Sequence, residues 1–143
     1  MRKYPLPEVL KGKCSPEDYT HWLYNKAAAH VRRDTQRGNR IATAIIYRDA
    51  IHRAVCHGGD NDAYTGRPLR WDLIRKYDNE KSKVGKREYK KQFADLPTVD
   101  HVGDGMSNPD FKICSWRIND CKNDLTIEEF VEVCRDVLKH NPE

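Results

Sequence analysis

The sequence predicts a single α+β domain that is mostly helical, with a short β-hairpin and a following helix packed against an N-terminal pair of helices. Apolar residues recur every three or four positions between Tyr19 and Val55, which is the period of an amphipathic α-helix. Two short apolar runs, at 96–99 and 111–116, flank a segment rich in glycine, asparagine and proline, which is typical of a hairpin. A chain of 143 residues has the length of one domain with one core.

Residues 1–58 are expected to form the N-terminal helical hairpin, after an irregular arm at 1–14. Ser15 and Pro16 mark the first helix start as N-cap and first helical residue, and Gly38 marks its end. The second helix is expected from about Ile41 to His57, before two glycines. The side chains expected between these helices are Tyr19, Trp22, Leu23, Ala27 and Val31 from the first, and Ile41, Ala44, Ile45, Ile51 and Val55 from the second.

Residues 59–95 are expected to be mainly irregular, because turn-forming and charged residues dominate them. The expected segments are a turn at 58–62, a small hairpin at 63–71, a helical turn at 72–77, a mobile loop at 78–88 and a short helix at 89–93. The closing helix begins with a capping box at Thr126. It is expected to bury one apolar stripe, made of Ile127, Phe130, Val131, Cys134, Val137 and Leu138.

The charge distribution points to a nucleic-acid partner. The net charge is +4, but residues 1–58 carry +6 and residues 96–143 carry −5. A basic part can hold a polyanion while an acidic part concentrates divalent cations. No apolar run approaches the ~18 residues of a membrane span, and no secretory signal is seen, so we expect no membrane partner and a cytoplasmic location.

The segment 96–126 contains the candidate active-site residues. An apolar approach ends at Asp100 and His101, and after the hairpin Asn119 opens the helical part. Neighbours on a regular strand point to opposite faces, so we expect the strand to end there and let the two side chains converge. Carboxylate and carboxamide oxygens suit Mg²⁺ or Mn²⁺, and a histidine with a pKa near ~6.5 can deprotonate water. The segment therefore predicts a metal-dependent hydrolytic site.

The order Asp100-His101, a hairpin, and then Asn119-x-x-Lys122 resembles the HNH endonuclease family of the ββα-metal nuclease superfamily. The resemblance covers roughly residues 63–140 and implies an HNH core at 59–143. It implies that Asp100 and Asn119 hold one catalytic Mg²⁺ or Mn²⁺ and that His101 is the general base. The implied reaction is hydrolysis of DNA phosphodiester bonds, which leaves 5′-phosphate and 3′-hydroxyl ends.

The chain departs from the family at two features. The family's middle Asn, which ties down the hairpin loop, has no counterpart, because Phe111 stands at the matching position with Asn108 and Asp110 nearby. Many relatives bind a structural zinc through two Cys-x-x-Cys pairs. The five cysteines here form no such pair, so no structural zinc is expected.

Basic side chains around the motif are candidate nucleic-acid contacts: Lys122, Arg117, Arg67, Arg70, Lys90 and Lys91. Two alternatives stay open beside a DNA endonuclease. One is a non-catalytic nucleic-acid-binding protein with an HNH-like fold, which the missing middle Asn favours. The other is an RNA-directed nuclease, which shares the site and differs in groove shape and in contacts to the 2′-hydroxyl.

Overall fold

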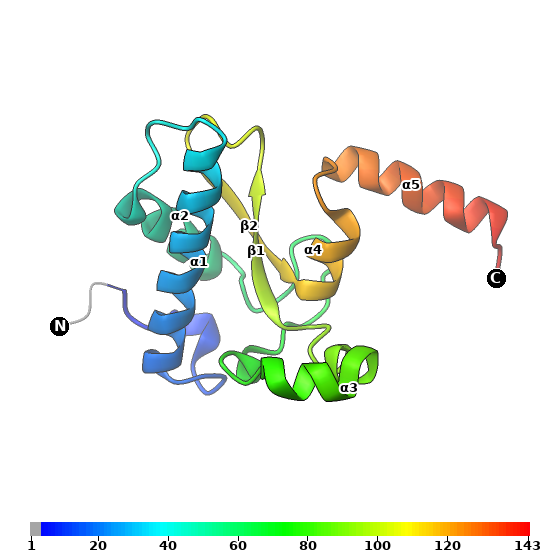
Figure 1. Cartoon of the computed structure of the whole chain (residues 1–143), viewed down its shortest axis with the longest axis horizontal. Helices are drawn as coiled ribbons and strands as arrows, with labels where there is room; N and C mark the ends of the chain where they lie inside the picture. The colour runs from blue at the N-terminus through cyan, green and yellow to red at the C-terminus, as the bar shows by residue number, and fades with distance from the viewer. Residues whose placement is uncertain (1–3) are drawn as a thin grey trace.

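The structure, a computed structural model, describes residues 4–143 and has the α+β class that the sequence predicts (Figure 1). Residues 1–3 of the expected arm lie outside the described residues. The elements are α1 (Pro16–Gln36), α2 (Ala44–Cys56), α3 (Asn79–Lys91), β1 (Pro97–Val102), β2 (Asp110–Ser115), α4 (Trp116–Lys122) and α5 (Ile127–His140), with short 3₁₀ turns at Glu8–Leu10 and Trp71–Leu73. The antiparallel pair β1–β2 lies between the α1–α2 pair and α4 (Figure 1).

The helical hairpin α1–α2 forms as expected, but it buries a different set of residues from α2. The Ser15 hydroxyl caps α1 by accepting a hydrogen bond from the Asp18 N–H at 3.0 Å. The prediction that Ile41 and Ile45 are buried is wrong, since their exposed fractions are 49% and 57%. Ile41 precedes α2, which begins only at Ala44, and Ile45 points away from the stripe that enters the core. That stripe consists of Tyr47, Ala50, Ile51 and Val55.

Helix α1 covers the free edge of β1. The Trp22 indole N–H donates to the Pro97 carbonyl, and His30 Nε2 bonds to the Val99 carbonyl, each at 3.1 Å. These bonds use the outward-facing carbonyls that an edge strand would otherwise expose. Burial lowers the pKa of His30 to about 4, so His30 is neutral at physiological pH and acts as a structural donor.

The free edge of β2 is covered by the loop that follows α2. The Ala63 N–H donates to the Ile113 carbonyl at 2.9 Å, and the Asp62 carboxylate accepts from the Ser115 N–H at 2.8 Å. The expected small hairpin at 63–71 is present only as a turn, closed by a single β-bridge between Asn61 and Pro68. Both edges of the two-stranded sheet are thus hydrogen-bonded to other parts of the chain.

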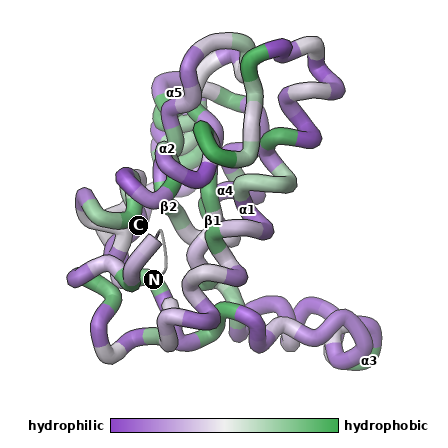
Figure 2. The backbone as a smooth tube through the Cα atoms, turned by 90° about the vertical axis from the view of Figure 1, so that its left-hand side faces the viewer, coloured by the Kyte–Doolittle hydropathy of each residue, from purple (hydrophilic) through white to green (hydrophobic). Residues whose placement is uncertain are grey.

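The expected mobile loop at 78–88 is instead most of helix α3, so that prediction is wrong, but the helix is interrupted at Lys86, whose φ of 50° and ψ of −128° are not helical and which follows Gly85. Asp78 caps the helix by accepting from the N–H groups of Glu80 and Lys81. Ion pairs one turn apart, such as Lys83 to Glu80 at 3.1 Å, support it on the surface. The helix buries no residue and stands apart from the body with a mostly hydrophilic surface (Figure 2). The sequence indicated a loop because this segment has no apolar stripe. The helix is stabilised instead by its N-cap and by ion pairs between surface side chains.

The closing helix α5 begins with the predicted capping box, because Thr126 and Glu129 exchange both side-chain bonds. The prediction that it buries an apolar stripe is wrong, since α5 has no buried residue. It projects away from the rest of the molecule (Figure 1). None of the helices found within residues 4–143 combines the length and the apolar character that crossing a membrane requires.

Candidate functional site

The tip of the hairpin borders a cavity of about 590 Å³, which we call the hairpin cavity. Its walls come from the end of α1, from β1 and the hairpin loop, and from the segment joining α4 to α5. Asp100 and His101 both line it. Four basic side chains also line it: Arg33, Arg37, Lys112 and Lys122. A carboxylate, an imidazole and cations suited to phosphate thus border one space.

Asp100 points toward α4 and is almost fully buried. Its Oδ2 lies 2.9 Å from the Lys122 ammonium and accepts a hydrogen bond from the Tyr64 hydroxyl at 2.5 Å. Burial, together with the bond to Asp100, raises the pKa of Tyr64, so this hydroxyl remains a donor. The Asp100 carboxylate is therefore a buried acceptor that already attracts a cation.

His101 points to the other face of the hairpin, toward α1 and α2. Its Nδ1 lies 2.6 Å from Oδ2 of Asp34, and the exposed fractions of the two side chains are 7% and 1%. An N–H on Nδ1 would not be aligned with this oxygen, so the two groups lie in close polar contact without a directed hydrogen bond. The Tyr47 hydroxyl donates to the same Asp34 oxygen at 2.6 Å. The Phe111 ring packs on the imidazole, with ring centres 4.6 Å apart.

The expected break of the strand at Asp100 and His101 does not occur. The ladder continues through the pair His101–Phe111 to the pair Val102–Asp110, so the two side chains keep the opposite directions of a regular strand. They still border the same cavity, because the cavity runs past the end of the hairpin. Asp100 and His101 therefore do not converge on a single ion, and each is held by its own neighbouring side chains.

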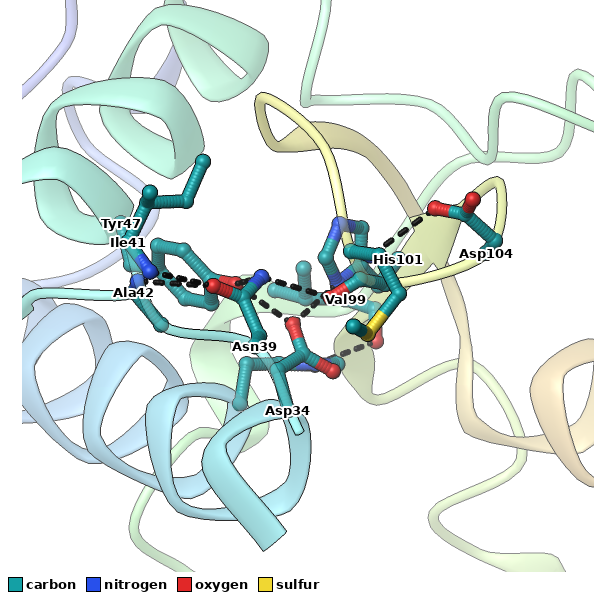
Figure 3. Close-up of polar contacts among 11 residues, drawn as sticks. Asp34, Asn39, Ile41, Ala42, Tyr47, Val99, His101 and Asp104 are labelled. Atoms are coloured by element: carbon teal, nitrogen blue, oxygen red, sulfur yellow. Dashed lines mark hydrogen bonds and ion pairs between the residues drawn. The ribbon is translucent and has the colours of Figure 1, made fainter. Parts of the chain in front are cut away.

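The hairpin loop is braced by Asn39, which lies between α1 and α2 (Figure 3). Its Nδ2 donates to the Gly105 carbonyl at 2.6 Å, while its Oδ1 accepts from the N–H groups of Ile41 and Ala42. Gly105 has φ of +74°, and a Cβ there would lie 3.1 Å from an Asp34 oxygen. The resemblance assigns the bracing of the hairpin loop to a middle Asn within the motif. In this chain Asn39, which lies outside the motif, braces the loop.

The structure does not bring Asn119 into the hairpin cavity. The cavity-lining side chain from this part of α4 is Lys122, one turn further on, and Lys122 is the residue that meets Asp100. No group of three or more His, Cys, Asp or Glu side chains suited to a metal occurs within residues 4–143. Of the two expected metal ligands, Asp100 lines the hairpin cavity and Asn119 does not.

A second hollow of about 630 Å³ lies between α3 and α4, and we call it the basic groove. It brings together three predicted nucleic-acid contacts, Lys90, Lys91 and Arg117, beside the indole of Trp116. Three further cations from α3 line it: Lys83, Lys86 and Arg87. No residue lines both hollows, and they lie on opposite sides of α4.

The other two predicted contacts lie outside both hollows. The Arg70 guanidinium is held by the Asp72 carboxylate through bonds of 2.9 and 2.7 Å. Arg67 lies 3.7 Å from an Asp95 oxygen. Both arginines thus have acidic neighbours in the chain itself.

Two of the residues that support the site, Asp34 and Tyr47, were not identified from the sequence. A signal for Asp34 was present, because it continues the buried stripe of α1 at helical spacing after Leu23, Ala27 and His30. An acid at a core position is rarely buried without a partner. Tyr47 carried no such signal, since its apolar ring accounts for its burial.

Comparisons with protein-family models, with curated proteins and with solved structures found no match to this chain.

Proposed function

We propose that the protein is a divalent-metal-dependent endonuclease of the HNH type that hydrolyses DNA phosphodiester bonds at the hairpin cavity. One observation carries the proposal: His101, paired with the buried Asp34, borders the same cavity as the buried Asp100. An imidazole supported by a carboxylate is suited to accept a proton from water. The motif resemblance described above assigns the same two residues to catalysis.

His101 is the general base in this proposal. The Asp34 carboxylate beside Nδ1 favours the tautomer with the proton on that nitrogen, which leaves the lone pair on Nε2. Nε2 accepts a proton from the attacking water, and Asp34 stabilises the imidazolium that results. The Phe111 ring on one face of the imidazole holds its orientation.

The residues present fit a divalent cation at Asp100. Its buried carboxylate is a hard oxygen donor, and a bound metal would have to displace the Lys122 ammonium that lies 2.9 Å from it. We propose Asn119 as the second ligand on the motif resemblance. Bound Mg²⁺ or Mn²⁺ would supply positive charge for the scissile phosphate and the leaving 3′ oxygen.

DNA is the proposed substrate because cations line both hollows. Arg33 and Arg37 border the hairpin cavity, and six basic residues line the basic groove. Such side chains bind phosphates without reading sequence. Trp116 adds a flat apolar surface to the groove. The products would be 5′-phosphate and 3′-hydroxyl ends, and the reaction would take place in the cytoplasm.

Cleavage of supercoiled plasmid tests the proposal, with Mg²⁺, with Mn²⁺ and with EDTA. We expect nicking with either metal and none with EDTA. His101→Ala should lower the rate by about 10²–10⁴-fold, the usual contribution of a general base, and should leave DNA binding intact. His21→Ala is the matched control, because His21 is an exposed histidine of α1. Unchanged nicking by His101→Ala, or nicking in EDTA, would refute the proposal.

A second candidate is a non-catalytic nucleic-acid-binding protein of the same fold. The ion pair between Lys122 and Asp100 favours it, because the ammonium lies against the carboxylate that a metal needs. Such a protein would bind DNA equally with and without EDTA and would release no cleaved product. Running an RNA duplex and a single-stranded RNA beside the plasmid separates the RNA-directed nuclease from both.

A further inference from the structure

The basic groove between α3 and α4 presents positive charge that the chain neutralises only in part. Its six cations are all exposed: Lys83, Lys86, Arg87, Lys90, Lys91 and Arg117. Lys83 and Lys91 each contact a glutamate of α3, at 3.1 and 3.5 Å. No carboxylate within residues 4–143 lies at ion-pair distance from the other four, and of the lining residues only Asp120 is acidic. The groove is therefore suited to a polyanion.

Trp116 adds an aromatic surface beside these cations. It is the first residue of α4, and it is half-buried. Its ring meets that of Tyr77 in an edge-to-face contact, with ring centres 5.0 Å apart, while the residue also lines the groove. Tyr77 in turn contacts the rings of Tyr89 and Phe93, at 5.4 and 5.2 Å. This aromatic cluster connects α3 to α4 and holds the indole in place at the groove.

The combination of cations and an indole favours unpaired bases over a duplex. Each base of a duplex is stacked between its neighbours, so its face is not available to a protein side chain. A single strand exposes these faces, and proteins bind it without sequence preference by stacking bases on aromatic rings beside a basic groove. The volume of about 630 Å³ lies within the range of ligand pockets. Phosphates of either form can contact the cations, but only unpaired bases gain the stacking.

We propose that the basic groove binds single-stranded DNA, with one base stacked on Trp116 and the neighbouring phosphates held by Lys86, Arg87, Lys90 and Arg117. The groove shares no lining residue with the hairpin cavity, so a strand bound there leaves the candidate active site open. The inference rests on the proposed DNA partner and not on cleavage, because binding in the groove needs neither a metal nor His101.

Intrinsic fluorescence of the full chain in EDTA tests the proposal separately from cleavage. The chain has three tryptophans. Trp22 and Trp71 are buried, with exposed fractions of 6% and 1%, so Trp116 is the tryptophan that a ligand can reach. We expect oligo(dT) to quench the emission and a duplex of the same length to quench it much less. Trp116→Phe should remove the quenching. Equal quenching by the two ligands, or quenching that persists in Trp116→Phe, would overturn the proposal.

Fluorescence anisotropy separates the stacking from the charge. Trp116→Leu should raise the dissociation constant for oligo(dT) at least about fivefold and leave that for the duplex unchanged. Trp116→Phe should retain most of the affinity, because its ring can still stack on a base and pack on Tyr77. Tyr24→Leu is the matched control, since Tyr24 is an exposed aromatic residue of α1 outside the groove.

Three results of these titrations would contradict the proposal. The first is an unchanged affinity of Trp116→Leu for oligo(dT). The second is an equal loss of affinity for oligo(dT) and for the duplex, which would indicate a general defect of the groove in place of lost stacking. The third is tighter binding of oligo(U) than of oligo(dT), which would overturn the assignment to DNA.

Discussion

The carboxylate of Asp34, in α1, lies 2.6 Å from Nδ1 of His101, in β1. Both side chains are almost fully buried, and the Tyr47 hydroxyl holds the same carboxylate oxygen from α2. Three elements that are distant in sequence thus determine the orientation of one imidazole. The contact makes the N-terminal helices part of the candidate active site.

Asp34→Asn should impair catalysis more than folding. With its NH₂ group at the position of the Asp34 oxygen that contacts both neighbours, the Asn would donate to His101 Nδ1 and to the Tyr47 hydroxyl oxygen, which would shift the ring proton to Nε2. That tautomer has no lone pair for the attacking water, so we expect kcat to fall at least about tenfold. Plasmid nicking under saturating DNA measures this, and the ¹⁵N shifts of the imidazole report the tautomer. Wild-type kcat with an altered tautomer would rule out the role given to Asp34.

Acidification should destabilise the fold through His30. Its pKa falls from 6.5 in the unfolded chain to about 4 in the fold, chiefly through burial and also through Arg33. Between these values the unfolded chain binds a proton that the folded chain does not, so the unfolding free energy decreases as pH falls through this window. The shift corresponds to about 3 kcal/mol.

Urea unfolding at neutral and acidic pH measures the contribution of His30. His30→Gln keeps a donor for the Val99 carbonyl and should remove this part of the pH dependence. His21→Gln, an exposed substitution on the same helix, should retain it. An identical pH dependence in His30→Gln and wild type would contradict the assignment.

Lys122→Met should convert Asp100 into a site whose stability depends on metal. Removing the ammonium leaves a buried carboxylate without its cation, which costs about 3–5 kcal/mol. If Asp100 is a metal ligand, Mn²⁺ should raise the Tm of this variant more than that of wild type. The double variant with Asp100→Asn should show no metal effect in the same thermal scans. An unchanged Tm of Lys122→Met in Mn²⁺ would argue against a metal at Asp100.

The basic groove should account for much of the salt dependence of DNA binding. Replacing Lys90 and Lys91 together by Gln should weaken binding and lower the slope of log K against log salt by about 2. Fluorescence anisotropy with a duplex at several salt concentrations gives this slope. Arg70→Gln is the matched control, since Asp72 already holds that guanidinium outside the groove. Equal slopes for both variants would show that DNA does not use the groove.

Asn123→Gly should stabilise the protein. Asn123 ends α4 with φ of 53° and ψ of −126°, a conformation that suits glycine and strains residues with a Cβ. We expect the unfolding free energy to rise by about 1 kcal/mol. Asp120→Gly, in the exposed middle of α4, should instead lower it by about 0.5–1 kcal/mol. Calorimetry of both variants checks the opposite signs.

Local signals in the sequence predicted the elements more reliably than their environment. The start of α1 at Ser15 and Pro16 and the capping box at Thr126 were predicted correctly, because capping depends on residues within one turn. The exposure of the α5 stripe was not, because burial depends on which elements lie nearby in space. The same limit explains α3, whose charged surface looked like a loop.

The residues of the candidate site show the same difference between local sequence signals and contacts made in space. Asp100, His101 and the basic residues were identified from a compact motif and from charge. Asp34 and Asn39, which support His101 and the hairpin loop, come from a distant part of the chain. Spacing along the sequence carries no information on such partners. The strand that was expected to end at His101 continues because Phe111 and Asp110 supply its ladder partners.

The hydrogen bond from Asn39 to Gly105 limits whether the β1–β2 hairpin and α4 could be grafted onto another protein. A graft of that unit onto a foreign scaffold would take along the imidazole but leave behind the amide that fixes the loop and the carboxylate that orients the ring. The proposed nuclease activity would therefore require the first two helices to be transferred together with the hairpin.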